Sequence, residues 1–313
     1  MTAQRGIPAS LMRGGTSKGL VFRAENLPSD SGERDAVLLA AMGSPDARQI
    51  DGVGGAHPLT SKVAVVRRSE RPDADVDYLF LQVSLDRAEV SDNQNCGNML
   101  AAVGPFAIEE GIVPATDDPT PVRIWMENTS SLVVAHVPVE AGRPRYDGTA
   151  HIDGVPGTHA PVPLDFLDIA GSTCGALLPT GAVSDVIDDV RVTCIDNGMP
   201  VVCVGAADLG VTGYESPSEL ETNGELRAAV ESIRLKAGSL MRLGDVAELT
   251  TPKICLLAAP QHGGAVSTRT FIPHRVHEAI GVFGAVSVAT ACLLPGSVAN
   301  DVAKVGGGGG QEG

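Results

Sequence analysis

Apolar and polar residues alternate along several short stretches of the chain, which predicts half-buried β-strands. These predicted strands are residues 62–67, 76–85, 122–126, 131–137, 190–194, 201–204 and 253–258. Helical spacing appears at residues 34–42, 96–110, 224–243 and 283–294. The second and fourth of these helices are rich in small residues and apolar on nearly every side. They are therefore expected to lie inside the protein, one in each half of the chain.

The length of the chain, 313 residues, is about twice that of a typical domain, which predicts two domains. Residues 165–180 are interpreted as the passage between the two halves. We expect an N-terminal domain over residues 1–184 and a C-terminal domain over residues 185–305. The glycine-rich residues 306–313 are expected to be disordered.

Composition narrows the possible functions. A formal net charge of −15 argues against a nucleic-acid-binding protein, which needs clustered Lys and Arg. The N-terminal residues lack the apolar run of a secretory signal, and no run of apolar residues is long enough to cross a membrane. The 6 cysteines occur singly and form no CxxC pair, so we expect free thiols in a cytoplasmic protein.

Residues 12–19, MRGGTSKG, are the densest candidate for a binding segment. Two glycines followed by Thr16, Ser17 and Lys18 offer backbone N–H groups, hydroxyls and a cation, which together suit a carboxylate. The lysine precedes the last glycine, so the segment does not match a nucleotide-binding P-loop. An ordinary hairpin turn with a solvated lysine explains the same residues equally well.

Two further segments carry polar residues next to predicted elements. Residues 43–62 form a long Gly- and Pro-rich loop that places Ser61 and Lys62 at the start of a strand, although an ordinary surface loop fits too. Residues 91–99, SDNQNCGNM, open the first buried helix, with Cys96 at its N-terminus. Helix N-termini favour anions, so this turn is favoured as an anion site over an inert buried cysteine.

The C-terminal half offers weaker signals. Residues 194–200, CIDNGMP, predict a strand that ends in a tight turn, and residues 267–280 contribute Arg269, His274 and His277. The two histidines have no cysteine or carboxylate at ligand spacing, so no metal site is expected. The sequence also lacks the glycine motifs of hydrolases and of dinucleotide-binding proteins.

Taken together, these segments resemble the PrpF family. The resemblance rests on RGGTSKG, GSPDARQIDGVGGAHPLTSKVAVV, NCGNMLAAVGPFAIE, CGALLPTG, TCIDNGMPVV and TFIPHR, which occur in this order. It implies an α+β fold similar to that of diaminopimelate epimerase. In that fold each of two lobes has a mixed or antiparallel sheet around a central helix, and the active site lies in the cleft between the lobes.

The resemblance also implies an activity. Family members are isomerases that need no metal, flavin or nucleotide, and that move a proton and a double bond in a small polycarboxylate. The expected reaction is keto–enol tautomerisation of 4-oxalomesaconate in gallate degradation. Cis–trans isomerisation of 2-methylaconitate is the alternative, and non-catalytic polycarboxylate binding is a third possibility. A homodimer is expected by analogy, with neither nucleic acid nor membrane as a partner.

The resemblance assigns roles to particular residues. Lys62 matches the lysine that transfers the proton, and Cys96 matches the cysteine of the first lobe, which either returns the proton or shapes the anion site. Phe283 occupies the position of the second cysteine found in related epimerases. A lysine with the ordinary pKa of ~10.4 is a poor base, so the cations Arg13, Lys18 and Arg48 are expected to surround and activate it. The expected substrate-binding residues are Arg13, Thr16, Ser17, Lys18, Arg48, Ser61, Asn95, Gly97, Asn98, Met199, Arg269 and His274.

The chain departs from the family after Lys304, where it continues as a glycine-rich segment. Compared with family members, this chain is expected to lack the strands that complete the second lobe. We therefore expect a less stable second lobe in this form of the protein.

Overall fold

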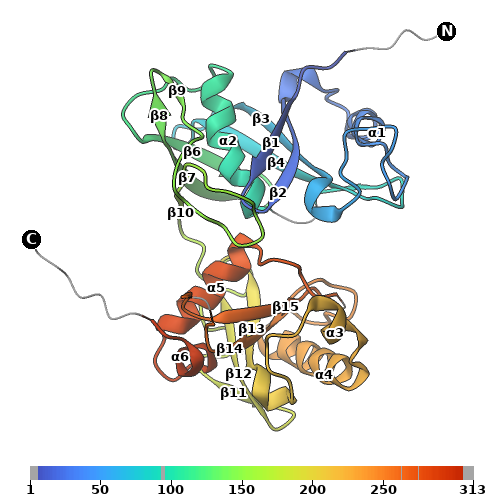
Figure 1. Cartoon of the computed structure of the whole chain (residues 1–313), viewed down its shortest axis with the longest axis vertical. Coiled ribbons are helices and arrows are strands. Elements are labelled where there is room, and N and C mark those ends of the chain that lie inside the picture. Colours follow the sequence, from blue (N-terminus) through green and yellow to red (C-terminus); the bar gives the residue numbers. More distant parts are fainter. Residues whose placement is uncertain (1–5, 93–95, 262, 274, 306–313) are drawn as a thin grey trace, which may run out of the picture. The chain divides into compact units, whose positions relative to one another are not determined.

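The computed structural model describes residues 6–92, 96–261, 263–273 and 275–305. The chain divides into two compact units, residues 1–168 (unit 1) and residues 169–313 (unit 2). In each unit, helices pack against a β-sheet (Figure 1). The α+β character expected from the sequence is therefore present in both.

Unit 1 contains the N-terminal hairpin, the first buried helix and a large mixed sheet. Its elements are β1 (Ser10–Gly14), β2 (Ser17–Arg23), η1 (Ala24–Asn26), α1 (Ser31–Met42), η2 (Pro58–Thr60), β3 (Lys62–Arg68), β4 (Val76–Val83), β5 (Val90–Ser91), α2 (Gly97–Glu109), β6 (Thr120–Met126), β7 (Ser131–Val137), β8 (Val139–Glu140), β9 (Arg143–Pro144) and β10 (Leu164–Phe166).

The sheet of unit 1 has the strand order β1-β2-β3-β4-β6-β7-β10, with β5 paired to β4. Alternation along its strands sends side chains to two faces. On one face, Leu20, Val63 and Leu81 pack against Leu38 and Met42 of α1. We call this the α1 face. The opposite face, covered by α2, is the α2 face.

Helix α2 is buried along nearly its whole length, as its apolar sequence predicts. The helix lies close to β6 and β7 at Gly104, where an added Cβ would be 2.7 Å from Cγ2 of Val137. A larger side chain at Gly104 would therefore push the helix off the sheet. The N-cap residue of α2 is Cys96, so the sequence-predicted start of the helix is correct to one residue.

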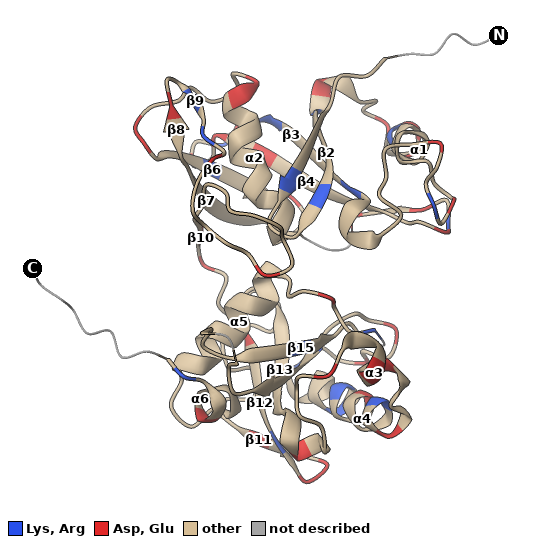
Figure 2. Cartoon of the chain, in the orientation of Figure 1, with Lys and Arg blue, Asp and Glu red and all other residues tan. Residues whose placement is uncertain are grey.

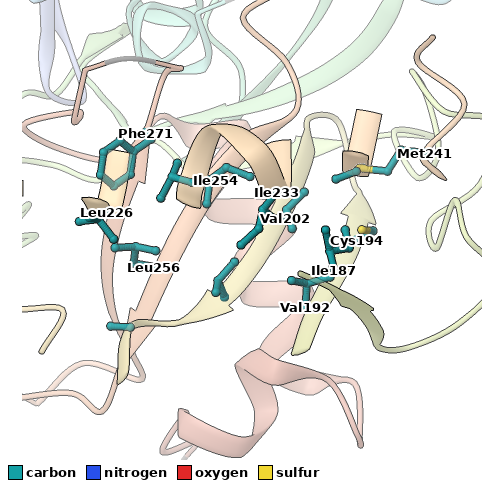
Figure 3. Close-up of a cluster of buried hydrophobic side chains, with 14 of the residues drawn as sticks. Ile187, Val192, Cys194, Val202, Leu226, Ile233, Met241, Ile254, Leu256 and Phe271 are labelled. Atoms are coloured by element: carbon teal, nitrogen blue, oxygen red, sulfur yellow. The ribbon is translucent and has the colours of Figure 1, made fainter. Parts of the chain in front are cut away.

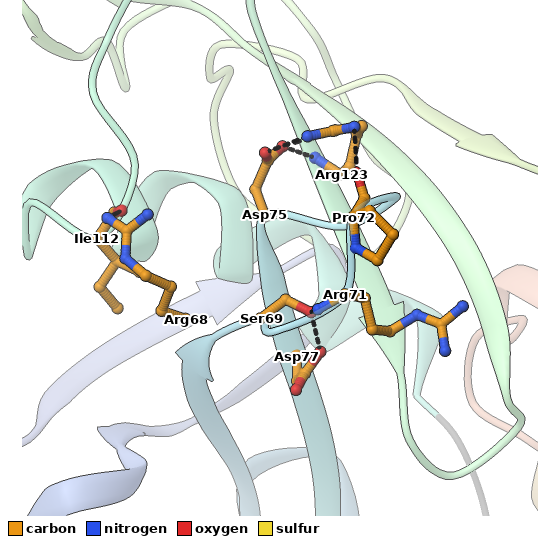
Figure 4. A network of polar contacts seen from close by, with 8 residues as sticks. All are labelled: Arg68, Ser69, Arg71, Pro72, Asp75, Asp77, Ile112 and Arg123. Atoms are coloured by element: carbon orange, nitrogen blue, oxygen red, sulfur yellow. Dashed lines mark hydrogen bonds and ion pairs between the residues drawn. The ribbon is translucent and has the colours of Figure 1, made fainter.

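A network of polar contacts holds the turn between β3 and β4 (Figure 4). The Ser69 hydroxyl donates to Oδ1 of Asp77 at 2.6 Å and accepts the backbone N–H of Arg71. Arg123 of β6 pairs with Asp75, with 2.7 Å between Nη2 and Oδ1. These contacts fix the β3–β4 turn to β6 at one end of the sheet. Across both units, acidic residues are spread over loops and helix ends, as Figure 2 shows.

Unit 2 is built on a smaller sheet with the strand order β11-β12-β13-β14-β15. Its elements are β11 (Asp185–Ile187), β12 (Val190–Asp196), β13 (Pro200–Gly205), η3 (Ala206–Leu209), α3 (Pro217–Thr222), α4 (Gly224–Leu240), β14 (Lys253–Ala258), β15 (Ser267–Phe271), α5 (Val282–Leu293) and α6 (Val298–Val302).

The sheet of unit 2 also has a helix on each face. Ile254, Leu256 and Phe271 pack against Ile233 and its neighbours on α4 (Figure 3). On the other face Cys203, Cys255 and Leu257 pack with α5 and α6. Helix α5 is less buried than its sequence predicts, because Leu293 on its outer side is 65% exposed.

The two units repeat one strand arrangement without an evident sequence repeat. In unit 1, β1–β2 pair antiparallel, β2–β3 parallel and β3–β4 antiparallel. In unit 2, β12–β13, β13–β14 and β14–β15 follow the same sequence of directions. In both units a largely apolar helix, α2 or α5, follows these strands and packs against the sheet.

The division between the units follows Asp168, earlier than the 184/185 boundary inferred from the sequence. Unit 2 begins at Ile169, and the segment that follows is bonded to the end of β12. Oδ2 of Asp196 accepts the N–H groups of Thr173 at 2.8 Å and Cys174 at 2.7 Å. These bonds attach the connecting segment to the second sheet. The expected tail at residues 306–313 lies outside the described residues.

Candidate active site

The β1–β2 turn lies directly on the first turn of α2, and two glycines make this approach possible. An added Cβ at Gly14 would be 2.2 Å from the carbonyl oxygen of Asn98, and one at Gly15 would be 2.4 Å from Oδ1 of Asn98. Gly15 also has φ +53°, which disfavours other residues. Nδ2 of Asn98 donates to the Thr16 hydroxyl at 3.0 Å. The MRGGTSKG segment is thus a hairpin turn that packs on a helix N-terminus.

Cys96 lies at the same place, between the hairpin and β4. Its Sγ is 3.9 Å from the Ser17 hydroxyl, and its carbonyl oxygen accepts the Tyr78 hydroxyl at 3.3 Å. Burial, with a smaller contribution from Cys96, raises the pKa of Tyr78, so this phenol stays protonated. The N-terminal N–H groups of α2 have no partner within the helix, and they carry the positive end of its dipole.

Lys62 is the first residue of β3, and its side chain lies on the α2 face. The parallel register places it beside Gly19 of β2, where an added Cβ would be 2.2 Å from the carbonyl oxygen of Lys62. Lys62 is 8% exposed. Its Nζ donates to Oε1 of Gln82 at 2.9 Å and lies 5.0 Å from the centroid of the Phe80 ring. Lys62 therefore has a fixed position beside the hairpin strand β2.

Ser61 is fully buried beneath this lysine. Its hydroxyl accepts Nε2 of Gln49 at 2.6 Å, and its carbonyl oxygen accepts Nε2 of Gln82 at 2.9 Å. Oε1 of Gln49 accepts the N–H of Ala56 within the long 43–62 loop, and the bond from Gln49 to Ser61 ties this loop to the start of β3. Ser61 therefore helps to hold this loop, and its role in substrate binding stays a prediction.

Sequence analysis missed Gln49 and Gln82. The signal for Gln82 is visible in retrospect, because it is an uncharged polar residue within the mostly apolar segment YLFLQV of β4. Gln49 carries no comparable signal, since it lies in the loop and its contacts depend on the folded path of the chain.

The cations expected around Lys62 lie elsewhere. Arg13 and Lys18 are cross-strand partners, and alternation places both on the face opposite Ser17 and Lys62. Nη1 of Arg13 donates to the carbonyl oxygen of Gly15 at 2.7 Å, within its own turn. The Arg48 side chain is 76% exposed and pairs with Asp46. The aromatic ring of Phe80 and the amide of Gln82 surround Lys62 instead.

In unit 2 the turn that holds Met199 packs on α5. The Ser287 hydroxyl donates to the carbonyl oxygen of Met199 at 2.8 Å and accepts the N–H of Asn197 at 3.1 Å. Phe283, which the family resemblance aligns with the second cysteine of related epimerases, packs against Gly198, where an added Cβ would be 2.7 Å from the ring. A phenyl ring supplies neither acid nor base.

Arg269 lies on β15, in register with Leu256, on the face of the unit 2 sheet that packs against α4. Its guanidinium donates to the carbonyl oxygens of Glu215 at 2.7 Å, Tyr214 at 3.2 Å and Thr268 at 2.9 Å. These bonds hold the segment before α3. Asn95 and His274, the remaining expected ligands apart from Gly97, lie outside the described residues. Gly97 is the first residue of α2.

All 6 cysteines are free thiols and buried, as their spacing predicts. Burial raises the pKa of Cys174, Cys194 and Cys255 to about 12, so these thiols of unit 2 stay protonated. Within the described parts of the chain, no group of three or more His, Cys, Asp or Glu is placed to hold a metal ion. No helix in the same residues is long and apolar enough to span a bilayer.

The arrangement in unit 1 suits proton transfer next to an anion. A lysine and a thiol lie on one face of one sheet, beside a helix N-terminus and the Thr16 and Ser17 hydroxyls. A lysine can take a proton, a thiol can give one, and a helix N-terminus stabilises negative charge.

Comparison with solved structures identifies the class of fold. The crystal structure of a methylitaconate-delta-isomerase has a TM-score of 0.84 and 39% sequence identity, covering 96% of this chain and 84% of that one. A hydroxyproline epimerase from Agrobacterium vitis has a TM-score of 0.52 at 15% identity, covering 93% of this chain and 78% of that one. The fold is thus shared with isomerases and epimerases.

The family follows from the sequence comparisons. The family model described as "PrpF protein" matches residues 4–310. A (4E)-oxalomesaconate Delta-isomerase from Novosphingobium sp. (strain KA1) is 62% identical, over 95% of this chain and 84% of its own length. A 4-oxalomesaconate tautomerase from Pseudomonas putida is 60% identical, over 97% of this chain and 84% of its own length. A 2-methyl-aconitate isomerase from Shewanella oneidensis is 36% identical, over 94% of this chain and 83% of its own length. The chain belongs to the PrpF family.

Proposed function

We propose that this protein is an isomerase that interconverts the keto and enol forms of 4-oxalomesaconate, without a cofactor, in the breakdown of gallate. The observation that carries the choice of substrate is the high identity, over nearly the whole chain, to two relatives named for oxalomesaconate. The side chains of unit 1 supply the groups that such a reaction needs.

Tautomerisation requires that a proton leave the carbon next to the carbonyl group and that a proton reach the carbonyl oxygen. In the proposed mechanism, neutral Lys62 removes the first proton at Nζ, and the C–H electron pair moves into the enolate. The Cys96 thiol then donates a proton and becomes a thiolate. Proton exchange with water afterwards restores the amine of Lys62 and the thiol of Cys96.

The negative charge of the enolate and of the substrate carboxylates needs a binding partner in an acidic protein. The first turn of α2 provides one, since the N–H groups at Gly97 and Asn98 are at the positive end of the helix. The Thr16 and Ser17 hydroxyls lie beside it on the hairpin. Because these donors are fixed by backbone packing, they need little reorganisation during the reaction.

Cis–trans isomerisation of 2-methylaconitate is the alternative within the same chemistry. The lower identity to the 2-methyl-aconitate isomerase makes it the second choice. Non-catalytic binding of a polycarboxylate is a third function, and it requires a protein that binds the acid without converting it.

One experiment separates the three. The purified full chain is incubated with 4-oxalomesaconate, 2-methylaconitate and aconitate, and the ultraviolet absorbance of the conjugated acids is followed. Preferential turnover of 4-oxalomesaconate supports the proposal, whereas preferential turnover of 2-methylaconitate selects the alternative. Calorimetric binding of an acid that is not turned over would indicate the non-catalytic function.

A further inference from the structure

The strand register places Gln82 directly opposite Lys62. In the antiparallel β3–β4 pair, Lys62 and Gln82 are cross-strand partners, so their side chains lie on the same face. Oε1 of Gln82 accepts the hydrogen bond from Nζ of Lys62 at 2.9 Å. This contact joins the side chain that we assign as the base to the neighbouring strand.

The orientation of the Gln82 amide follows from the chemistry of its other partners. Nε2 donates to the carbonyl oxygens of Ser61 at 2.9 Å and Pro58 at 3.2 Å. Carbonyl oxygens only accept hydrogen bonds, so the NH₂ group must face them. The oxygen of the amide is therefore directed at Lys62, and a flipped amide would lose all of these bonds.

We propose that Gln82 is a positioning residue that directs the amine of Lys62 while leaving it able to lose its proton. This inference rests on the proposed function, in which Lys62 is the base. A neutral amine donates one N–H to Oε1 of Gln82, and this bond fixes the direction of its lone pair. An uncharged acceptor provides that direction without the strong preference for the ammonium form that a carboxylate would create.

The surroundings of Lys62 make the uncharged amide important. The described titratable groups on the α2 face of β2–β4 are Arg23, Arg68 and Tyr78, with the Cys96 thiol of α2 and His57 before η2. Arg23 and Arg68 bond to the carbonyl oxygens of Glu110 and Ile112, beyond the other end of α2. The Phe80 ring favours the ammonium form through a cation–π contact. A carboxylate at position 82 would add strongly to that preference.

The decisive variant is Gln82→Glu, which keeps the size of the side chain and adds a negative charge beside Lys62. The reactivity of Lys62 toward acetic anhydride is measured by peptide mass spectrometry across a pH series. The labelling midpoint is the pH at which Lys62 reacts at half its maximal rate. We expect this midpoint to rise by about one pH unit or more, because an opposite charge within a few ångströms favours the ammonium form. An unchanged midpoint in a folded variant overturns the proposal.

A second variant, Gln82→Met, removes the acceptor without adding charge. We expect the labelling midpoint of Lys62 to fall and kcat to drop by about tenfold or more, with KM changed little, because the misdirected amine affects the proton transfer. If Gln82 only supported the 43–62 loop, the melting temperature would fall while the labelling midpoint stayed at the wild-type value. That result would also overturn the proposal.

Gln261→Glu is the matched control, since it makes the same chemical change at an exposed position of unit 2. Its labelling midpoint for Lys62 should equal that of the wild type. The labelling assay needs no substrate, so it reports on Gln82 even if the wild type converts none of the acids. If the wild type converts none of the acids but the Gln82 variants shift the labelling midpoint, the proposed function is refuted. The contact between Gln82 and Lys62 is then still supported.

Discussion

The side-chain amide of Asn98 donates a hydrogen bond to the hydroxyl of Thr16, 3.0 Å away, and so links the first turn of α2 to the tip of the β1–β2 hairpin. The two residues are distant in sequence, and the contact depends on the close approach that Gly14 and Gly15 allow. The Thr16 hydroxyl and the first turn of α2, which we propose bind the substrate anion, are therefore brought together by two glycines.

Gly14→Ala should damage this part of the site. The new Cβ would lie 2.2 Å from the carbonyl oxygen of Asn98, so the hairpin must move away from α2. We expect destabilisation of about 1–3 kcal/mol. We also expect kcat/KM to fall at least about tenfold, because small displacements of binding groups are costly in catalysis. Thermal melting and steady-state kinetics measure the two effects.

Gly6→Ala, where no atom lies within 4 Å of the added Cβ, serves as control. Equal behaviour of the two variants would contradict the prediction.

Lys62→Met should abolish most of the turnover and leave the fold intact. General acid–base catalysis is typically worth ~10²–10⁴-fold, and methionine fills a similar volume beside Phe80. The measurement is kcat with 4-oxalomesaconate, with circular dichroism to verify folding. Lys236→Met, at an exposed lysine that pairs with Asp188 in unit 2, controls for loss of a positive charge. A Lys62→Met enzyme with more than a tenth of wild-type activity would remove Lys62 from the mechanism.

Cys96→Ser separates the chemistry of the thiol from its position at the N-cap. Serine is a good N-cap residue, so the melting temperature should stay the same or rise. A hydroxyl is a much weaker proton donor than a thiol, so kcat should fall about tenfold or more if Cys96 returns the proton. Turnover within twofold of wild type would mean that Cys96 only shapes the anion site.

The sequence predicted the elements of this site better than its contacts. Helix α2 was found to within one residue because a long apolar segment has few alternatives to burial. The position of Lys62 at the start of β3 was also correct. Lys18 was expected near the base because residues 12–19 were interpreted as a candidate binding segment. They belong to two strands, and alternation sends Lys18 to the other face.

The contacts of Gln82 and Ser61 depend on the register between β3 and β4, which is set by packing of the whole sheet. A single sequence carries the alternation within each strand but not the offset between strands. The same limit explains Arg269, whose polar side chain suggested a ligand site. The guanidinium of Arg269 instead donates to backbone carbonyl oxygens of the segment before α3. No local sequence pattern indicates that this segment is its partner.

Arg234→Met should strongly destabilise unit 2. Arg234 is fully buried, forms a two-pronged ion pair with Glu231, and donates to the carbonyl oxygens of Val246, Leu249 and Ala247. Its loss leaves a charge and several carbonyl groups without their partner, which costs about 3–5 kcal/mol. Urea denaturation measures the change. Arg227→Met, at an exposed position on the same helix α4, should cost under about 0.5 kcal/mol. Similar losses for both variants would contradict this account of Arg234.

The ion pair between Asp75 and Arg123 should make stability depend on pH in the acid range. Burial acts to raise the pKa of Asp75, but hydrogen bonds from Arg123 outweigh it and hold the pKa below its ordinary value. A carboxyl group whose pKa is lower in the folded state stabilises the protein above its unfolded pKa of ~3.9, and the effect is lost as the pH falls through the folded pKa. Asp75→Asn should therefore lower the melting temperature at pH 7 and have a much smaller effect near pH 2.

Asp117→Asn, at an exposed position of unit 1, should show no such difference between the two pH values. An equal loss at both pH values for Asp75→Asn would mean that the hydrogen-bond geometry, rather than the charge of Asp75, stabilises the β3–β4 turn.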